Sequence, residues 1–319
     1  MTAINTQPPQ ELLDQPQDLA AFGPDLTLTA AGLEELAQDD SRPACFSIAA
    51  QEAMAEACDT LARCAERGDS IYGLTTGFGP HVRYAADENA HDHGDGLIAH
   101  LGAGFGSYLP AERVRAMIAA RLHTIAQGRS GIDPSAADAL LDLFNQGLTP
   151  AVPCIGSVGA SGDLIPMAHV ARVLTGAGRV LDRRGSAIDV TEVEGFTPLR
   201  LSGRDALAIV NGTSFMTAHA ALALARAQRR LHIAEDLTGY AYRLLGCRAQ
   251  ALDDRLHAAR GHRGQRDSAR AILREASRFG AWEDTTRPLQ EVYSLRCAPQ
   301  FLGAARDQLD HARFTIETE

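Results

Sequence analysis

The segment GSVGASGDLIP, residues 156–166, decides how the fold of this 319-residue chain is interpreted. Its three glycines predict a loop. Asp163 is a residue type that caps helix N-termini, and Pro166 is a residue type accepted in a first helical turn. An apolar run follows as far as Leu174. The segment therefore predicts a glycine-rich loop at the N-terminus of a helix.

Two catalytic motifs of similar composition do not fit this segment. A phosphate-binding loop requires a lysine after its last glycine, but Asp163 follows Gly162 and its negative charge would repel phosphate. A nucleophile elbow centred on Ser161 would require a glycine at position 163. Taken alone, the segment is therefore most simply a turn that caps a helix.

On both sides of this loop the pattern is mainly helical. Apolar positions recur at steps of three and four residues, and Ser47 is a candidate N-cap for the first such run. Helices are predicted over residues 46–67, 112–127 and 135–146, over the long pattern from 203 to His257, and from Ala305 to the end. Short β-type pieces between residues 176 and 199 predict a small hairpin on a mainly α body.

The composition along the chain predicts three parts. Residues 1–22 are rich in Gln, Pro and Asp and are expected to form a disordered tail. Residues 23–204 are expected to form an N-terminal domain that carries the loop. Residues 205–319 are expected to be the first part of a long helical bundle.

Charge and cysteine usage exclude several classes of protein. The formal net charge of -10 argues against a broad nucleic-acid or anionic-membrane surface. The six cysteines contain no C-x-x-C pair, so the sequence indicates neither a zinc site nor a disulfide framework. Apolar stretches are interrupted by Asn, His or Arg, and no secretion signal opens the chain, so a cytoplasmic protein is expected. His91 and His93 have the spacing of a metal pair but lack a third ligand block, and are interpreted as loop residues.

Residues 156–166 also resemble the signature of the histidine, phenylalanine and tyrosine ammonia-lyases. The resemblance implies that Ala160-Ser161-Gly162 cyclises into 4-methylidene-imidazole-5-one (MIO), with no metal. The residue types suit this chemistry, because the Gly162 nitrogen must reach the carbonyl carbon of Ala160 in close packing. Ser161 then loses water and leaves an exocyclic methylene. The adjacent helix N-terminus adds partial positive charge near the electrophile.

Three further segments resemble the same family. IYGLTTGFGP, residues 71–80, resembles the mobile loop whose tyrosine is the catalytic base, which implies this role for Tyr72 and a substrate contact for Gly79. VNGTSF, residues 210–215, contains Asn211, which matches an asparagine that contacts MIO and substrate. YSLRCAPQ, residues 293–300, resembles a block in which Tyr293 positions substrate or relays a proton, Arg296 binds the substrate carboxylate and Gln300 supports the site.

Each of these residues taken alone has a commoner structural role. A tyrosine beside glycine usually packs in a turn, and a phenol with a pKa near ~10 must be activated to act as a base. An isolated arginine is usually a surface ion-pair partner, and a buried asparagine often satisfies helix backbone. The four blocks in family order favour the catalytic interpretation.

Substrate preference in the family follows a residue pair that faces the aromatic ring. The pair aligns with His100-Leu101 in LIAHLGAG, residues 97–104, and resembles the tyrosine-preferring members. Histidine can hydrogen-bond a phenolic hydroxyl, while leucine contacts the apolar ring. A lone histidine is more often structural.

The resemblance implies elimination of ammonia from L-tyrosine to give 4-coumarate. The substrate amine would add to the methylidene carbon, Tyr72 would remove a β-proton, and Asn211 and Tyr293 would orient the substrate. Phenylalanine or histidine ammonia-lyase and aromatic 2,3-aminomutase are the alternatives within the family.

The resemblance also implies an obligate homotetramer with active sites shared between subunits. On this interpretation Tyr72 lies far from Ser161 of its own chain and near that of a neighbour. Family members continue with a long C-terminal helical portion, which is missing from these 319 residues. The alternatives from other classes are therefore a non-catalytic fragment or interaction subunit, or a second polypeptide that supplies the remaining helices.

Overall fold

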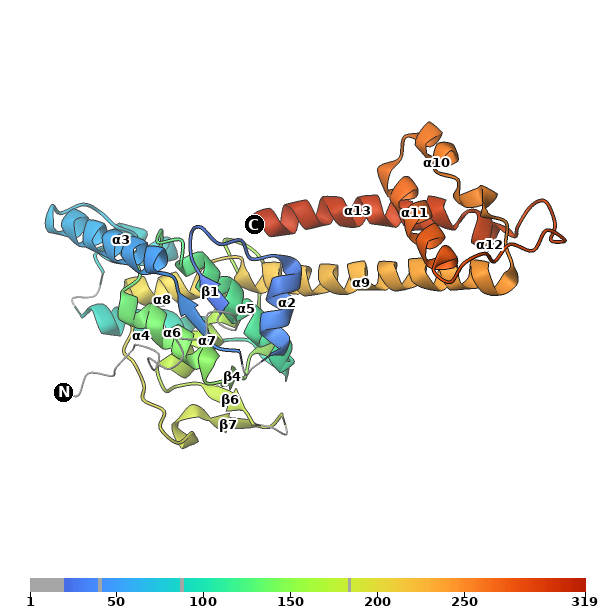
Figure 1. The fold of residues 1–319 in the computed structure, drawn as a ribbon. Helices are drawn as coiled ribbons and strands as arrows, with labels where there is room; N and C mark the ends of the chain where they lie inside the picture. The colour runs from blue at the N-terminus through green and yellow to red at the C-terminus, as the bar shows by residue number, and fades with distance from the viewer. Residues whose placement is uncertain (1–19, 40–41, 87–88, 183–184) are drawn as a thin grey trace. The chain divides into compact units, whose positions relative to one another are not determined.

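The computed structural model describes residues 20–39, 42–86, 89–182 and 185–319. As predicted, these residues are mainly α-helical (Figure 1). The chain divides into two compact units, Met1–His219 and Ala220–Glu319, so the division lies inside a long helix and later than the predicted boundary after residue 204. Residues 1–19 of the predicted tail lie outside the described residues.

The first unit is built around a central buried helix. Along α5 (Ala111–Ile125) the apolar side chains are almost completely buried, and α5 packs against α2 (Ala30–Gln38) and α6 (Pro134–Asn145). A second group of mutually packed helices carries the predicted site. It contains α4 (Ala90–Leu101), α7 (Leu164–Leu174) and α8 (Gly203–Val210).

Short strands lie around these helices. The parallel pair is β1 (Ala20–Phe22) with β2 (Ala44–Phe46), and the antiparallel pairs join β3 (Phe105–Tyr108) to β5 (Pro153–Ile155), β4 (Thr149–Pro150) to β6 (Arg179–Leu181), and β6 to β7 (Ala187–Asp189). The β6–β7 pair confirms the predicted hairpin. The end of the predicted tail is wrong, because residues 20–22 form β1 and the side chain of Phe22 is buried.

Most predicted helices of the first unit begin and end within two residues of their predicted limits. They include α3 (Ile48–Glu66), where Ser47 is the N-cap and its hydroxyl oxygen accepts a hydrogen bond of 3.1 Å from the nitrogen of Ala50. The interpretation of His91 and His93 as loop residues is wrong, because both lie on α4. Only a narrow face of α4 is buried, so its polar, glycine-containing sequence lacks the apolar spacing that reveals a helix.

The second unit contains the rest of α9 (Ser214–Leu245), α10 (Asp254–Arg260), α11 (Arg263–Ser277), α12 (Tyr293–Arg296) and α13 (Ala298–Thr318). The sequence did not predict α11 and placed the start of α13 too late. Helices α11 and α13 approach closely at Gly264 and Gly303, where an added Cβ on Gly303 would lie 2.3 Å from backbone of Gln265. Buried Glu235 accepts hydrogen bonds from Arg306 and Ser268.

The run Gly203–Leu245 is long and apolar enough to cross a membrane by length and composition. As the sequence analysis expected, Asn211, His219 and Arg226 interrupt this run. Half of its most apolar window is buried within the protein, which is typical of a core helix. Length and composition alone do not separate these two kinds of helix.

Candidate active site

The predicted loop before α7 has an unusual backbone. Ser161 has a φ of 63°, and among the described residues it is the one non-glycine residue with positive φ. Gly162 follows with a φ of 108°. An L-residue in the left-handed region is disfavoured and persists only where its surroundings hold it. The strained residue is therefore the one that carries the predicted chemistry.

The turn at Asn211 and Gly212, which joins α8 to α9, holds the loop in place. The side-chain nitrogen Nδ2 of Asn211 donates to the carbonyl oxygen of Ser161 at 2.9 Å. The backbone nitrogen of Asp163 donates to the oxygen of Gly212 at 2.8 Å. An added Cβ on Gly162 would lie 3.0 Å from that same oxygen, so the position favours glycine. The predicted contact of Asn211 with the tripeptide is present.

Asp163 occupies the N-cap position of α7, but its side chain makes no capping hydrogen bond to that helix. The buried carboxylate instead accepts from the hydroxyl of Ser157 at 2.6 Å and from the backbone nitrogen of Met216 at 2.9 Å. The nitrogen of Met216 is one of the otherwise unpaired donors in the first turn of α9. The carboxylate therefore connects the loop to the start of α9, which the capping interpretation did not foresee.

The segment of Tyr72 folds back on itself. The hydroxyl of Tyr72 accepts a hydrogen bond of 2.8 Å from the nitrogen of Gly79. The Tyr72 ring meets the edge of Phe78 at 6.1 Å between centroids, and Phe78 stacks on His93 of α4 at 4.2 Å. Gly73 has a φ of 73°, and an added Cβ there would lie 2.6 Å from the Phe78 ring. These contacts fix the segment while leaving the Tyr72 side chain 44% exposed.

A cavity of about 990 Å³ lies between this segment, α4, the loop and the end of α8. Its lining contains the following predicted site residues: Tyr72, Gly79, His100, Leu101, Ala160, Ser161 and Asn211. The expectation that Tyr72 lies far from Ser161 of its own chain is wrong, because both line this one cavity. The cause is the packing of α4 on α7 and α8, which brings the two loops to the same place.

The cavity also has lining residues that the sequence analysis did not assign. Phe78 and His93 form the stacked pair beside Tyr72, and Leu207 lies one helical turn before Asn211 on α8. Phe78 stands within the quoted segment of Tyr72, and the spacing of Leu207 from Asn211 is a helical signal. The contact between His93 and Phe78 depends on the tertiary fold, so no local sequence pattern predicts it.

Gly162 follows Ser161 in the loop, and the three remaining predicted site residues belong to the second unit. Tyr293 and Arg296 lie on α12, and Gln300 lies in the first turns of α13. All three are exposed, with Tyr293 at 69%. Beneath them, the backbone oxygen of Leu295 accepts a hydrogen bond of 3.1 Å from buried Tyr242. The segment is therefore anchored while its predicted functional side chains face outward.

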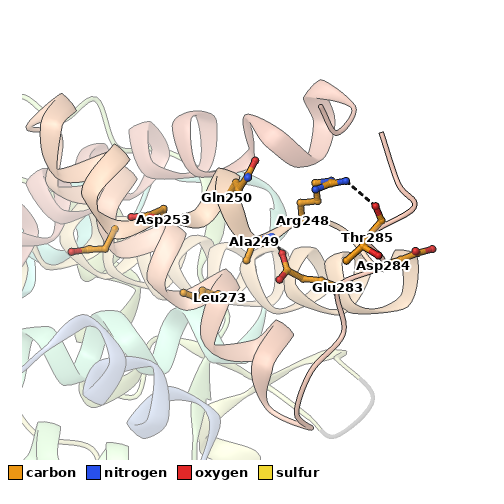
Figure 2. A pocket seen from close by; sticks show the side chains of 9 residues that line it. Arg248, Ala249, Gln250, Asp253, Leu273, Glu283, Asp284 and Thr285 are labelled. Atoms are coloured by element: carbon orange, nitrogen blue, oxygen red, sulfur yellow. Dashed lines mark hydrogen bonds between the residues drawn. The ribbon is translucent and has the colours of Figure 1, made fainter. Parts of the chain in front are cut away.

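A smaller pocket of about 560 Å³ in the second unit is lined by several charged residues (Figure 2). Its side chains are engaged with the protein: Arg248 donates to the oxygen of Thr285 at 2.9 Å, and Glu283 accepts from the nitrogen of Ala249 at 2.6 Å. Within the described ranges, no group of three or more His, Cys, Asp or Glu side chains is arranged to hold a metal ion.

Comparison with known proteins identifies the family of this chain. Residues 28–319 match the family model for aromatic amino acid lyase. The chain belongs to the aromatic amino acid lyase family. The family predicted from residues 156–166 and the three supporting segments is therefore confirmed.

Relatives within this family have several different activities in their names. A tyrosine ammonia-lyase of Cereibacter sphaeroides is 44% identical over 262 residues, covering 75% of this chain and 49% of the relative. A probable histidine ammonia-lyase of Halobacterium salinarum is 37% identical over 300 residues, covering 92% and 57%. The solved structure of a tyrosine aminomutase from Streptomyces globisporus has a TM-score of 0.80 and 30% identity, covering 92% and 59%. The chain thus spans roughly half of the length of these proteins.

Proposed function

We propose that this aromatic amino acid lyase chain forms MIO from Ala160-Ser161-Gly162 and contributes to the elimination of ammonia from L-tyrosine. The observation that carries the proposal is the strained Ser161 held by Asn211 in a cavity that also contains Tyr72 and His100. A left-handed residue followed by a glycine brings a chain to a sharp bend. Such a bend suits attack by the Gly162 nitrogen on the carbonyl carbon of Ala160.

The tripeptide surroundings fit the prosthetic group. Asn211 donates to the oxygen of Ser161, and this carbonyl would become the ring carbonyl after closure. The N-terminus of α7 places partial positive charge beside it. Once formed, MIO supplies an electrophilic methylidene carbon to the amine of the substrate.

Tyr72 is the proposed base for removal of the β-proton. Its hydroxyl already accepts from the nitrogen of Gly79, and the same donor would stabilise the negatively charged phenolate. The phenolate oxygen then takes a proton from the carbon next to the aromatic ring. Phe78 contacts the ring of Tyr72 from the side, and His93 in turn stacks on Phe78.

His100 and Leu101 are proposed to select the ring of the substrate. Both lie at the end of α4 and line the cavity that contains Tyr72 and Ser161. An imidazole there can hydrogen-bond a phenolic hydroxyl, whereas Leu101 contacts the apolar part of the ring. The Cereibacter sphaeroides tyrosine ammonia-lyase supports this choice through its 44% identity.

Arg296, Tyr293 and Gln300 are proposed to complete the site from another copy of the chain. Arg296 would bind the substrate carboxylate through its planar guanidinium, and Tyr293 would position the substrate or relay a proton. We therefore propose a homotetramer, and the relatives' greater length leaves room for a second polypeptide that supplies further helices. The exposure of Arg296, Tyr293 and Gln300 supports the proposal of a site shared between copies. An arginine in open water binds a carboxylate weakly, so Arg296 needs another copy to shield it.

The activity is tested by incubating purified protein with L-tyrosine, L-phenylalanine and L-histidine and separating the products. We expect 4-coumarate as the main product and a tryptic peptide, residues 130–172, lighter than its sequence mass by two waters. Ser161→Ala should keep both waters and lose all measurable turnover. A β-amino acid product would instead support the aminomutase alternative. Active protein whose peptide keeps its full mass would refute the proposal, whereas a lighter peptide without turnover would favour a non-catalytic subunit.

A further inference from the structure

Arg121 is a buried cation that the proposed reaction does not use. It lies on α5 with 4% of its surface exposed. Within the described part of the chain, no carboxylate pairs with it, and its Nε atom has no hydrogen-bond partner. Burial lowers the pKa of Arg121 to about 10. A buried charge without a carboxylate partner is unfavourable for folding. The placement of Arg121 therefore suggests a role other than stabilising the fold.

The guanidinium group of Arg121 lies directly behind the turn that holds the tripeptide. Its Nη2 atom donates to the carbonyl oxygen of Ala208, one of the last carbonyls of α8. A cation at this end of a helix also interacts favourably with the helix dipole. An added Cβ on Gly212 would lie 2.3 Å from Nη1 of Arg121, so the turn and the guanidinium are in close contact.

The opposite side of the same turn contacts the tripeptide. Asn211 donates to the oxygen of Ser161 at 2.9 Å, and Gly212 accepts from the nitrogen of Asp163 at 2.8 Å. Gly162 packs against the backbone of Gly212. A shift of the turn would therefore release the bend at Ser161. Arg121 supports one face of the turn, and the tripeptide rests on the other.

We propose that Arg121 is a positioning residue for ring closure by Ala160-Ser161-Gly162, an inference that rests on the proposed function. The Gly162 nitrogen bonds to the carbonyl carbon of Ala160, and the carbonyl oxygen leaves as water with the amide hydrogens of Gly162 and Ser161. The hydroxyl of Ser161 leaves as a second water with its Cα hydrogen. Arg121 acts by keeping the turn at Asn211 and Gly212 in the position that holds this bend.

A second buried arginine on the same helix provides a matched control. Arg115 is 5% exposed and lies on α5, as Arg121 does. It donates to the backbone oxygen of Phe144 at 3.0 Å and to that of Asp39 at 3.2 Å, and its guanidinium lies over the Phe144 ring. These partners belong to α6 and to the end of α2. Arg115 therefore tests what the loss of a buried arginine does away from the tripeptide.

The experiment follows loss of two waters from the tryptic peptide 130–172 over time after synthesis of the full chain. The variants are Arg121→Met, Arg121→Lys and Arg115→Met, each with its melting temperature measured. We expect Arg121→Met to slow the mass loss by about tenfold or more, as for a lost charged hydrogen bond. Arg121→Lys should be intermediate, because it keeps the charge but not the fork of donors. Arg115→Met should lower the melting temperature and close the ring at the wild-type rate.

The outcomes separate this inference from the proposed function. A wild-type peptide that keeps both waters overturns the proposed function and this inference with it. A wild-type peptide that loses them while Arg121→Met does so equally fast overturns only the role of Arg121. Equal slowing in Arg115→Met also overturns it, because general destabilisation would then explain the effect. If Arg121→Met does not fold, a folded Arg121→Lys protein with slowed mass loss supports the role, and one with the wild-type rate overturns it.

Discussion

The two parts of the predicted site differ in how far the surrounding chain encloses and fixes their side chains. In the first unit, the predicted residues surround one cavity and are fixed by contacts from several elements. In the second unit, Tyr293, Arg296 and Gln300 are exposed on α12 and α13. The residues of the first part are thus held around a cavity within one chain, whereas those of the second part lie on an exposed surface.

This difference indicates which parts of the proposed reaction one chain can support alone and which require another copy. Closing a strained loop requires a rigid backbone, and the turn at Asn211 and Gly212 supplies it within one chain. Binding a carboxylate strongly requires an arginine that is shielded from water. The exposed Arg296 lacks this shielding, so our proposal assigns it to the site of another copy.

The largest expected effect comes from mixing inactive variants. Tyr72→Phe protein and Arg296→Met protein should each be inactive, and exchange of their subunits should restore part of the activity. A mixed assembly contains some sites in which both residues are native, because the proposal takes them from different copies. Activity is measured before and after subunit exchange, with exchange followed by mass spectrometry of differently tagged chains.

The matched control mixes Tyr72→Phe with Ser161→Ala. These residues line one cavity of one chain, so no combination of subunits should contain a native pair and activity should stay absent. Restoration in this control, or none with Arg296→Met despite proven exchange, would contradict the division between the two parts of the site.

A smaller effect is expected at the substrate-selecting end of the cavity. His100→Phe should lower the ratio of kcat/KM for L-tyrosine to that for L-phenylalanine by about ten- to a hundredfold, because the phenolic hydroxyl loses its partner. The measurement is kcat/KM for both substrates in wild-type and variant protein. Ile98→Leu, a change of buried apolar shape on the same helix but outside the cavity lining, is the control and should leave the ratio nearly unchanged. An unchanged ratio in His100→Phe would mean that His100 does not recognise the ring.

The smallest effect concerns the anchoring of the exposed segment. Glu291 is buried just before Tyr293 and pairs with Arg287 at 2.6 Å. The hydrogen bond from Arg287 lowers the pKa of Glu291 below its usual 4.5. Because the folded-state pKa is the lower one, the pair stabilises the protein above about pH 4.5 and loses this contribution as pH falls through the folded value.

Glu291→Gln should therefore reduce the free energy of unfolding by about 1 to 3 kcal/mol at pH 7. The difference from wild type should shrink on acidification below the usual pKa of glutamate. Denaturant unfolding at neutral and acidic pH measures both. Asp310→Asn, at an exposed pair with Arg313, should change stability by less than about 1 kcal/mol. A pH-independent difference for Glu291→Gln would show that the carboxylate charge is not what anchors the segment.

Local patterns predicted the parts of the fold that have a strong local cause. Ser47 capped α3 as expected because its hydroxyl needs only the nitrogen three residues later. The hairpin of β6 and β7 was also predicted. Helix α4 was missed because it buries only a narrow face, and its His91 and His93 looked like loop residues. Phe22 was assigned to the tail because the sequence does not reveal that it pairs with β2.

The sequence by itself determined the family, together with the tripeptide proposed to form MIO and the residue types around it, since these depend on composition at fixed spacing. Only the tertiary structure decided that Tyr72 and Ser161 share a cavity of one chain, that Asp163 caps α9 and that Arg121 lies behind Gly212. Each of these contacts joins residues far apart in the chain. Their physical cause is the packing of whole helices, which no local pattern records.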